Sequence, residues 1–207
     1  MTNLDIKIGY FGQKKSGKSS IINYVFQNMS RKQTLNLQST TNPTIVEYTS
    51  TLLKIANLEI PGKYDSLDKL SAEDFERLKQ QDVFIYVFDL RSGDPESAVK
   101  QLKNQLAYLT KVNPNFLFYI FFHQADLDFL YLGNKIEESI NFFRRKFENL
   151  IREENFDMRL LERYHIKKTS IYDFSINAGS LTSPQRCHLQ CPGREATDHL
   201  VDDLECL

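Results

Sequence analysis

The feature that most constrains this chain is an eight-residue segment near its N-terminus, Gly12 to Ser19, which follows the pattern G-x-x-x-x-G-K-S. A short apolar run, residues 6–11, precedes it and is typical of a β-strand, whereas residues 19–29 favour a helix. Glycines let the backbone of such a loop curl so that successive N–H groups point inward, and the following helix adds its unpaired N-terminal donors. The segment therefore predicts a strand–loop–helix unit that binds phosphate groups.

The last two residues of this loop supply its remaining chemistry. The side chain of Lys18 is expected to reach the β- and γ-phosphates of a nucleoside triphosphate, and the hydroxyl of Ser19 is expected to bind Mg²⁺. A short pattern also matches by chance, but the strand before it and the helix after it are the context that the pattern requires. We therefore expect a nucleoside triphosphate at this loop.

Strand-like and helix-like segments alternate as far as Asn177. The apolar runs 83–90 and 116–122 predict strands buried on both faces, and residues 51–60 and 167–171 can supply further strands. Helical spacing of apolar residues predicts two helices, the first marked by Val99, Leu102, Leu106 and Leu109 and the second by Ile136, Ile140, Phe143, Phe147 and Leu150. Residues 30–50 are polar and are interpreted as a long mobile connection. The alternation predicts an α/β fold with a mainly parallel sheet.

Composition and charge exclude several classes of protein. Twenty-six basic residues against 27 acidic ones give a net charge of −1, so bulk charge does not predict a nucleic-acid partner. The longest apolar run, residues 116–122, is too short to cross a bilayer, and the N-terminus resembles neither a signal peptide nor, with Thr2, a myristoylation site. We expect a soluble intracellular protein without direct membrane insertion.

Two polar segments at the ends of predicted strands indicate which base the site binds. His123, Gln124, Ala125 and Asp126 end one strand, where GTP-binding proteins carry an [NTH]-K-x-D motif whose aspartate accepts hydrogen bonds from guanine. Residues 169–171, Thr-Ser-Ile, end the last strand, where a backbone N–H could meet the guanine O6 atom. Both follow the phosphate loop in the expected order, which favours GTP over ATP.

With these segments, the chain resembles the Rag GTPases, and within them the C/D-type branch together with its fungal counterpart. The residues that carry the resemblance are the loop with Ser20, then Val25, Phe26, Met29, Leu37, Gln38, Ser39, Thr40, Glu59, Ile60, Pro61, Gly62, Lys111, Val112, Asn113, Pro114, His123 and residues 169–173. The resemblance implies a P-loop NTPase fold, with a Ras-like G domain over residues 1–177. The family's final G-domain helix and roadblock dimerisation domain are not recognisable. Without that helix, one face of the sheet would expose apolar surface unless the tail or a partner covers it, and a truncated or mis-spliced chain is the remaining alternative. We expect a disordered tail over residues 178–207.

The resemblance also implies roles for individual residues. Ser19 and Thr40 would be the Mg²⁺ ligands, with Thr40 sensing the γ-phosphate together with the N–H of Gly62. The residues expected to surround the phosphates are Lys15, Ser16, Gly17, Lys18 and Ser20. Spacing alone adds Thr34, which is expected to contact the nucleotide from the segment that holds Thr40. The residues expected to frame and close over the base are His123, Asp126, Ser170 and Ile171.

Three residues depart from the usual pattern of small GTPases. Glu59 replaces the aspartate of the DxxG motif, and its extra methylene displaces the carboxylate. Lys63 stands where many GTPases carry the glutamine that orients the attacking water, and lysine cannot accept a hydrogen bond from that water. Gln124 replaces the lysine that packs on the base. We therefore expect slow hydrolysis.

The leading functional hypothesis is a GTP/GDP switch. By resemblance, it would pair with an A/B-type Rag GTPase and report amino-acid supply to the TOR kinase complex. It would be cytoplasmic and recruited by scaffold proteins to the lysosomal or vacuolar surface, with the nucleus as a second location. The alternatives are a non-hydrolysing nucleotide-binding scaffold and, less favoured, a P-loop ATPase or small-molecule kinase. Cys187, His188 and Cys191 fall short of the four ligands of a structural zinc site.

Overall fold

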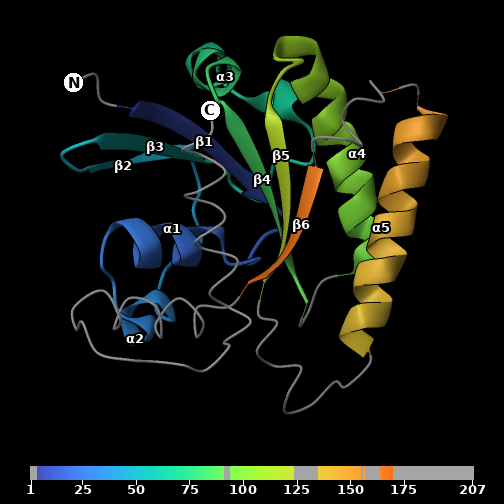
Figure 1. Cartoon of the computed structure of the whole chain (residues 1–207), viewed down its shortest axis with the longest axis horizontal. Coiled ribbons are helices and arrows are strands. Elements are labelled where there is room, and N and C mark those ends of the chain that lie inside the picture. The colour runs from blue at the N-terminus through green and yellow to red at the C-terminus, as the bar shows by residue number, and fades with distance from the viewer. Residues whose placement is uncertain (1–3, 91–93, 124–134, 155, 157–163, 170–207) are drawn as a thin grey trace.

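Strands and helices alternate in the computed structural model, which describes residues 4–90, 94–123, 135–154, 156 and 164–169 (Figure 1). The strands are β1 Leu4–Gly12, β2 Thr44–Thr49, β3 Leu53–Glu59, β4 Val83–Asp89, β5 Leu117–His123 and β6 Tyr164–Thr169. The helices are α1 Lys18–Phe26, α2 Arg31–Thr34, α3 Ala72–Lys79, α4 Pro95–Val112 and α5 Lys135–Glu153, with a 3-10 turn, η1, at Leu67–Lys69.

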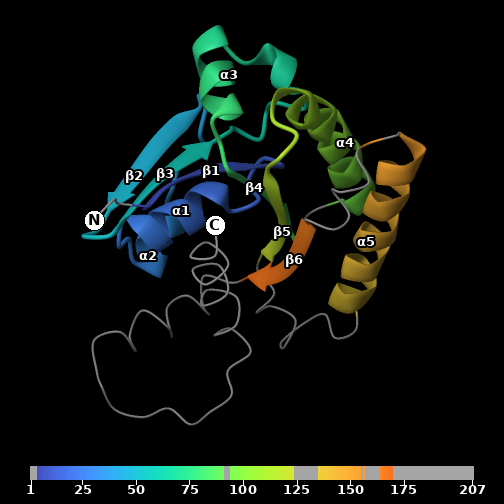
Figure 2. The same ribbon diagram turned by 45° about the horizontal axis from the view of Figure 1, so that its top comes forward.

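These strands form one sheet in the order β2-β3-β1-β4-β5-β6. β2 runs antiparallel to β3, and every other neighbouring pair is parallel. In Figures 1 and 2 the sheet lies between α1 with α2 and α4 with α5. The predicted α/β fold with a mainly parallel sheet is therefore confirmed. The carboxyl ends of β1, β4 and β5 meet at one edge of the sheet, and the loop after β1 begins there.

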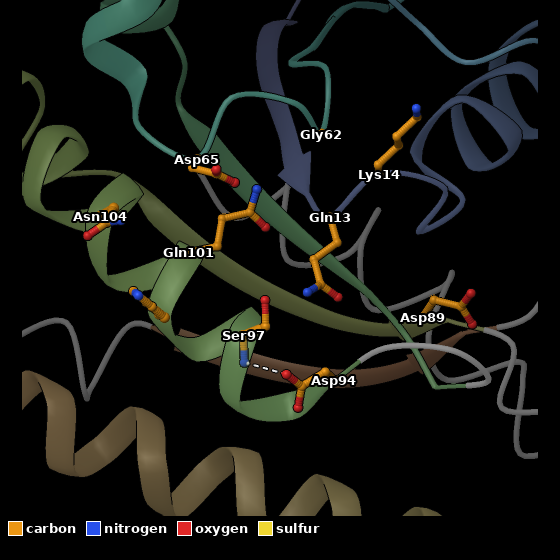
Figure 3. Close-up of a pocket in the computed structure, with 10 residues that line it drawn as sticks. Gln13, Lys14, Gly62, Asp65, Asp89, Asp94, Ser97, Gln101 and Asn104 are labelled. Carbon is orange, nitrogen blue, oxygen red and sulfur yellow. Dashed lines mark hydrogen bonds between the residues drawn. The ribbon is translucent and has the colours of Figure 1, made fainter.

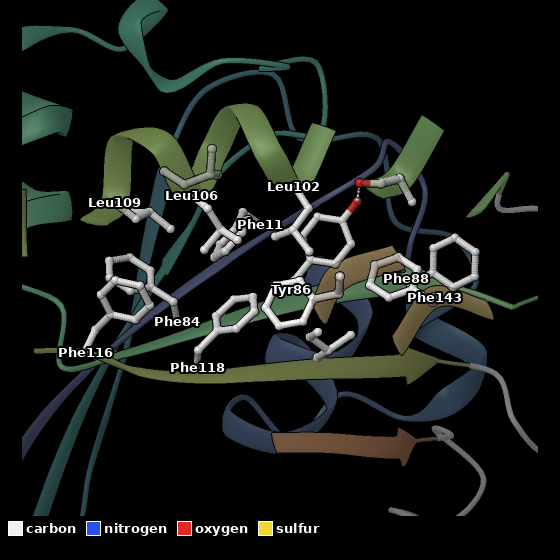
Figure 4. Close-up of a cluster of buried hydrophobic side chains, with 14 of the residues drawn as sticks. Phe11, Phe84, Tyr86, Phe88, Leu102, Leu106, Leu109, Phe116, Phe118 and Phe143 are labelled. Carbon is white, nitrogen blue, oxygen red and sulfur yellow. Dashed lines mark hydrogen bonds between the residues drawn. The ribbon is translucent and has the colours of Figure 1, made fainter. Parts of the chain in front are cut away.

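One face of the sheet packs against α3, α4 and α5 through aromatic side chains (Figure 4). Phe84 of β4 meets Phe116 edge to face, with ring centroids 4.9 Å apart. Tyr86 lies beside Phe143 of α5, and its hydroxyl donates to the carbonyl of Ala98 at 3.0 Å. Such rings bury large apolar areas, so this face anchors the central strands firmly.

The opposite face of β4 and β5 is also buried. The residues that project to this face, each at most 4% exposed, are Val83, Ile85, Val87, Tyr119 and Phe121. They join a second core cluster with Ile21 and Ile22 of α1. The predicted absence of a final helix and the predicted tail, 178–207, concern residues outside the described ranges.

Residues 30–50 differ from the predicted mobile connection, because they contain α2 and β2. Ser30 and Gln33 form a reciprocal cap at the start of α2: the Ser30 hydroxyl accepts from the Gln33 N–H at 3.4 Å, and the Gln33 side chain accepts from the Ser30 N–H at 2.8 Å. β2 pairs with β3 along its whole length but is largely exposed on both faces. The sequence did not predict this strand because its apolar pattern is weak. An edge strand pairs with a single neighbour and can form with little burial of its side chains.

Smaller differences concern element boundaries. α1 ends at Phe26 rather than residue 29, and Asn28 takes a left-handed backbone conformation, with φ 54°, that ends the helical path. β6 begins at Tyr164, before the predicted start at residue 167. Contacts across β5 decide that earlier start, since Phe118 pairs with Tyr164.

Candidate nucleotide-binding site

A cavity of about 330 Å³ lies at the carboxyl end of the sheet, beside the loop between β1 and α1. Crevices at this end of a parallel sheet are where α/β proteins bind ligands. The predicted site residues that line this cavity are Lys15, Ser16, Gly17, Lys18, Ser19, Ser20, Thr34, Thr40, Gly62 and His123. Asp126, Ser170 and Ile171, predicted to contact the base, lie outside the described residues, as does Gln124.

The loop after β1 takes backbone conformations that its glycines permit. Gly12 has φ 133°, and a Cβ atom there would lie 2.3 Å from the carbonyl oxygen of Val87. Gly17 has φ 97° and directly precedes α1, whose N-terminus receives no side-chain cap. The first N–H groups of α1 are therefore not capped by a side chain and lie beside the cavity. Together with the positive end of the helix dipole, they suit an anion.

Lys18 places a buried cation at the same end of the cavity. Its ammonium donates to the carbonyl of Gly12 at 3.1 Å and to that of Gln13 at 2.8 Å, and its side chain is only 4% exposed. Burial lowers the pKa of Lys18 from 10.5 to about 8, and the nearby Glu59 carboxylate opposes that shift. The loop thus holds a desolvated positive charge at a position that suits a bound polyanion.

Ser19, Thr40 and Glu59 bring three oxygen atoms together. The Ser19 hydroxyl lies 2.6 Å from Oε1 of Glu59, the Thr40 hydroxyl lies 2.9 Å from the same oxygen, and the two hydroxyls lie 2.9 Å apart. Two hydroxyl protons are shared among three close contacts, so one contact has no proton of its own. This oxygen-only set fits Mg²⁺, which prefers hard oxygen ligands. Both predicted metal ligands, Ser19 and Thr40, belong to it.

His123 lies under the phosphate loop. Its side chain is 1% exposed, and a Cβ atom built on Gly17 would lie 2.4 Å from its Cδ2 atom and 2.8 Å from its Nε2 atom. Only glycine leaves room for the imidazole at that position. In the structure His123 therefore supports the loop from the end of β5, next to the predicted base-binding segment.

Gly62 and Lys63 follow β3, and only Gly62 of the two lines the cavity. A Cβ atom on Gly62 would lie 2.3 Å from the backbone nitrogen of Lys14, so the segment after β3 touches the phosphate loop directly. Lys63 does not line the cavity, and its ammonium lies over the ring of Tyr64, 5.1 Å from the centroid.

Thr34 is 3% exposed, and its hydroxyl donates to the carbonyl of Arg31 at 2.8 Å.

Several lining residues were not among those predicted. They are Lys14, Leu35, Leu37, Gln38, Ser39 and Glu59. Lys14 lies inside the loop pattern, and the segment 37–40 together with Glu59 was recognised by resemblance. The sequence therefore contained features from which most of these residues could have been predicted. Leu35 could not have been predicted, because a single exposed apolar residue belongs to no motif or periodic pattern in the sequence.

A second cavity of about 560 Å³ adjoins the first, and both are lined by Lys14 and Gly62 (Figure 3). Its other lining residues are polar or charged and come from α4 with its N-cap, from the ends of β1 and β4 and from the segment after Gly62: Gln13, Asp65, Asp89, Asp94, Ser97, Lys100, Gln101 and Asn104. The segment around Gly62 therefore forms a partition between two cavities.

No helix in the described part of the chain has both the length and the apolar character needed to cross a bilayer. Within the same residues, no three His, Cys, Asp or Glu side chains gather to hold a metal ion, so the hydroxyl-containing set around Ser19 is of a different kind. Cys187, His188 and Cys191 lie outside the described residues.

Comparison with known proteins gives a consistent result. The model of the Gtr1/RagA G protein conserved region matches residues 7–179. The chain is 34% identical to GTP-binding protein GTR2 of Saccharomyces cerevisiae over 169 residues, which are 80% of this chain and 46% of that protein. It is 32% identical to Ras-related GTP-binding protein C of Homo sapiens over 174 residues, 82% of this chain and 41% of the relative. It is 31% identical to Ras-related GTP-binding protein D of Mus musculus over 179 residues, which are 84% of this chain and 37% of that protein. The chain spans less than half the length of each of these relatives.

Proposed function

The chain belongs to the Gtr1/RagA G protein family, and from this premise we propose that it binds GTP and GDP with Mg²⁺ and acts as a regulatory switch. The observation that carries the proposal is the phosphate end of the 330 Å³ cavity. There the buried ammonium of Lys18 and the first N–H groups of α1 converge from one loop. That arrangement is complementary to a row of phosphates.

The residues that would hold Mg²⁺ are Ser19 and Thr40, with Glu59 beside them. When bound, the ion would neutralise charge on the terminal phosphates. The residues of this chain do the rest: Lys18 neutralises phosphate oxygens, and Thr40 links the segment 35–41 to the loop. A nucleotide with a γ-phosphate would hold Thr40 and Gly62 in place, and loss of that phosphate would release Thr40.

We propose that GTP hydrolysis is slow. Lys63 is donor-only, and its ammonium lies over the Tyr64 ring instead of lining the cavity. A water that attacks the γ-phosphate therefore lacks the hydrogen-bond acceptor that orients it in other GTPases. The same observation favours a second function, a scaffold that binds nucleotide without hydrolysing it.

Single-turnover hydrolysis separates these two functions. The protein is loaded with γ-³²P-GTP and Mg²⁺, and phosphate release is followed alone and with a partner GTPase-activating protein. Release above the protein-free rate supports the switch, and release at that rate in both conditions supports the scaffold. Lys63→Gln serves as a companion, because a restored acceptor should raise the rate if orientation of water is what limits it.

Nucleotide binding itself is tested with fluorescent GTP, GDP and ATP. We expect GTP and GDP to bind more tightly than ATP, and Ser19→Asn to weaken Mg²⁺-dependent binding of GTP. Ser66→Asn is the matched control, because Ser66 makes no side-chain capping bond and does not line the cavity. Unchanged GTP affinity in Ser19→Asn would contradict the site, whereas tighter binding of ATP would favour an ATPase or small-molecule kinase.

Family membership further supports a proposed partnership with an A/B-type Rag GTPase and a role in amino-acid signalling to the TOR kinase complex. We propose that scaffold proteins recruit the chain from the cytoplasm to the lysosomal or vacuolar surface, with the nucleus as a second location. Co-expression with an A/B-type partner, followed by size-exclusion chromatography, tests the pairing. Separate elution of the two chains in every nucleotide state would contradict it.

A further inference from the structure

The segment that follows Gly62 is attached to helix α4 by two buried carboxamides. Gln105 donates from Nε2 to the carbonyl oxygen of Tyr64 at 2.9 Å, and Gln101 donates to the same oxygen at 3.5 Å. The two glutamines lie one helical turn apart on α4, and they are 0% and 6% exposed, respectively. A single backbone carbonyl thus receives two donors from the protein interior.

Other contacts of Tyr64 strengthen this attachment. Its N–H donates to the carbonyl of Pro61 at 3.1 Å, which closes a turn over residues 61–64. Its side chain packs against the aromatic core. The buried hydroxyl of Tyr86 also lies 3.3 Å from Oε1 of Gln101, and its single proton is shared between that atom and the carbonyl of Ala98 at 3.0 Å. The turn is therefore fixed at its carbonyl, at its N–H and through its ring.

Moving the carbonyl of Tyr64 away from α4 would leave buried polar atoms without hydrogen bonds. The Oε1 atom of Gln105 is buried without a hydrogen-bond partner among the described residues. If Tyr64 moved away, the Nε2 atom of Gln105 would also lose its partner, and a buried polar group without a partner is costly. The turn is thus held even when the cavity contains no nucleotide.

The turn also carries Gly62, whose backbone lies against Gln13 and Lys14 of the phosphate loop. In Figure 3 Gln101 extends from α4 toward the Gly62–Asp65 segment. We infer that Gln101 and Gln105 are positioning residues: through Tyr64 they hold Gly62 at the γ-phosphate end of the cavity in advance. This inference rests on the proposed binding of GTP there. It assigns part of the affinity for GTP, but not for GDP, to α4, none of whose residues line the nucleotide cavity.

Gln105→Leu tests the inference, with Asn104→Leu as the control on the same helix. Asn104 is half-buried, and among the hydrogen bonds of the described residues none joins its side chain to Tyr64. In nucleotide-free protein, we expect Gln105→Leu to raise amide hydrogen exchange in residues 62–66 about tenfold, and Asn104→Leu to leave it unchanged. We expect the affinity for GTP to fall about tenfold and that for GDP by less than twofold.

Two outcomes would overturn the inference: exchange in residues 62–66 that matches the wild type, or an equal fall in both affinities, which would mean that Gln105 only supports the fold. Where Gln105→Leu lacks a cooperative unfolding transition, Gln105→Met, which keeps the length of the side chain, is measured with the same criteria. If the wild type binds neither nucleotide, the proposed function fails, and the exchange comparison alone decides whether the carboxamides hold the turn.

Discussion

The two walls of the nucleotide cavity are built differently. The wall formed by residues 12–20 is largely buried around Ser16 and Lys18, and its glycines fit against Val87 and His123. The facing wall, residues 35–41, is mostly exposed, with Leu35 75% exposed. Among the described residues, the side-chain hydrogen bonds that join this second wall to the rest of the site are those of Thr40.

The difference between the two walls shows how one cavity can bind a nucleotide and also respond to the presence of its γ-phosphate. The buried wall keeps its charge and its N–H groups in place without a ligand, so it can supply affinity for any phosphate chain. The exposed wall has few contacts to lose, so a small change at Thr40 can release it. We therefore expect substitutions in the first wall to affect all nucleotides and the fold, and those in the second to affect mainly GTP.

The largest effect is expected from Gly17→Ala. The new Cβ atom would meet the His123 ring at 2.4 Å in a left-handed backbone conformation, so the free energy of unfolding should fall by about 3 kcal/mol. Ser39→Ala in the exposed wall should change it by less than about 0.5 kcal/mol. Urea denaturation measures both. Adding His123→Ala to Gly17→Ala should recover part of the loss, and no recovery would show that the contact is not the cause.

Lys18→Met should come next. It removes the buried ammonium but keeps the length of the side chain, so affinities for GTP and GDP should both fall about a hundredfold. Lys32→Met, the same substitution on exposed helix α2, is the control and should change neither affinity more than twofold. Isothermal titration calorimetry gives the constants. A selective loss of GTP binding alone would contradict the division between the walls.

Thr40→Val should have a smaller and selective effect. Valine has the shape of threonine without the hydroxyl that contacts Ser19 and Glu59. Affinity for GTP in the presence of Mg²⁺ should fall about tenfold, and that for GDP should stay within twofold. Thr41→Val, at the exposed neighbouring position, should match the wild type in the same fluorescence titration. Equal losses for GTP and GDP would mean that Thr40 belongs to the first wall.

The smallest effect is expected from pH. Burial lowers the pKa of Lys18 to about 8 in the free protein, and a bound triphosphate requires the charged form. Affinity should therefore fall about threefold as the pH rises from about 7.5 to 8.5. The nucleotide-free fold should become more stable as the pH rises from about 8 toward 10.5, because the unfolded chain then holds more protons. Lys18→Met should lose both dependences, and persistence of either would assign it to another group.

The sequence predicted much of the buried architecture and the phosphate end of the site. The runs around β4 and β5 were recognised because strands covered on both faces are continuously apolar. β2 was missed because an edge strand exposed on both faces has no such pattern. Gln101 and Gln105 were also missed, since glutamine on a helix is ordinarily a surface residue, and only the fold brings the carbonyl oxygen of Tyr64 within reach of both side chains.

By itself, the sequence predicted a phosphate-binding loop between a strand and a helix and showed that the chain resembles the Rag GTPases. Local chemistry suffices for that, because the loop's glycines, Lys18 and Ser19 lie within eight consecutive residues. Only the tertiary structure decided that Glu59 meets Ser19 and Thr40, that His123 supports Gly17, and that α4 holds Tyr64. Those contacts join residues distant in the chain, and packing of the sheet and helices sets their distances.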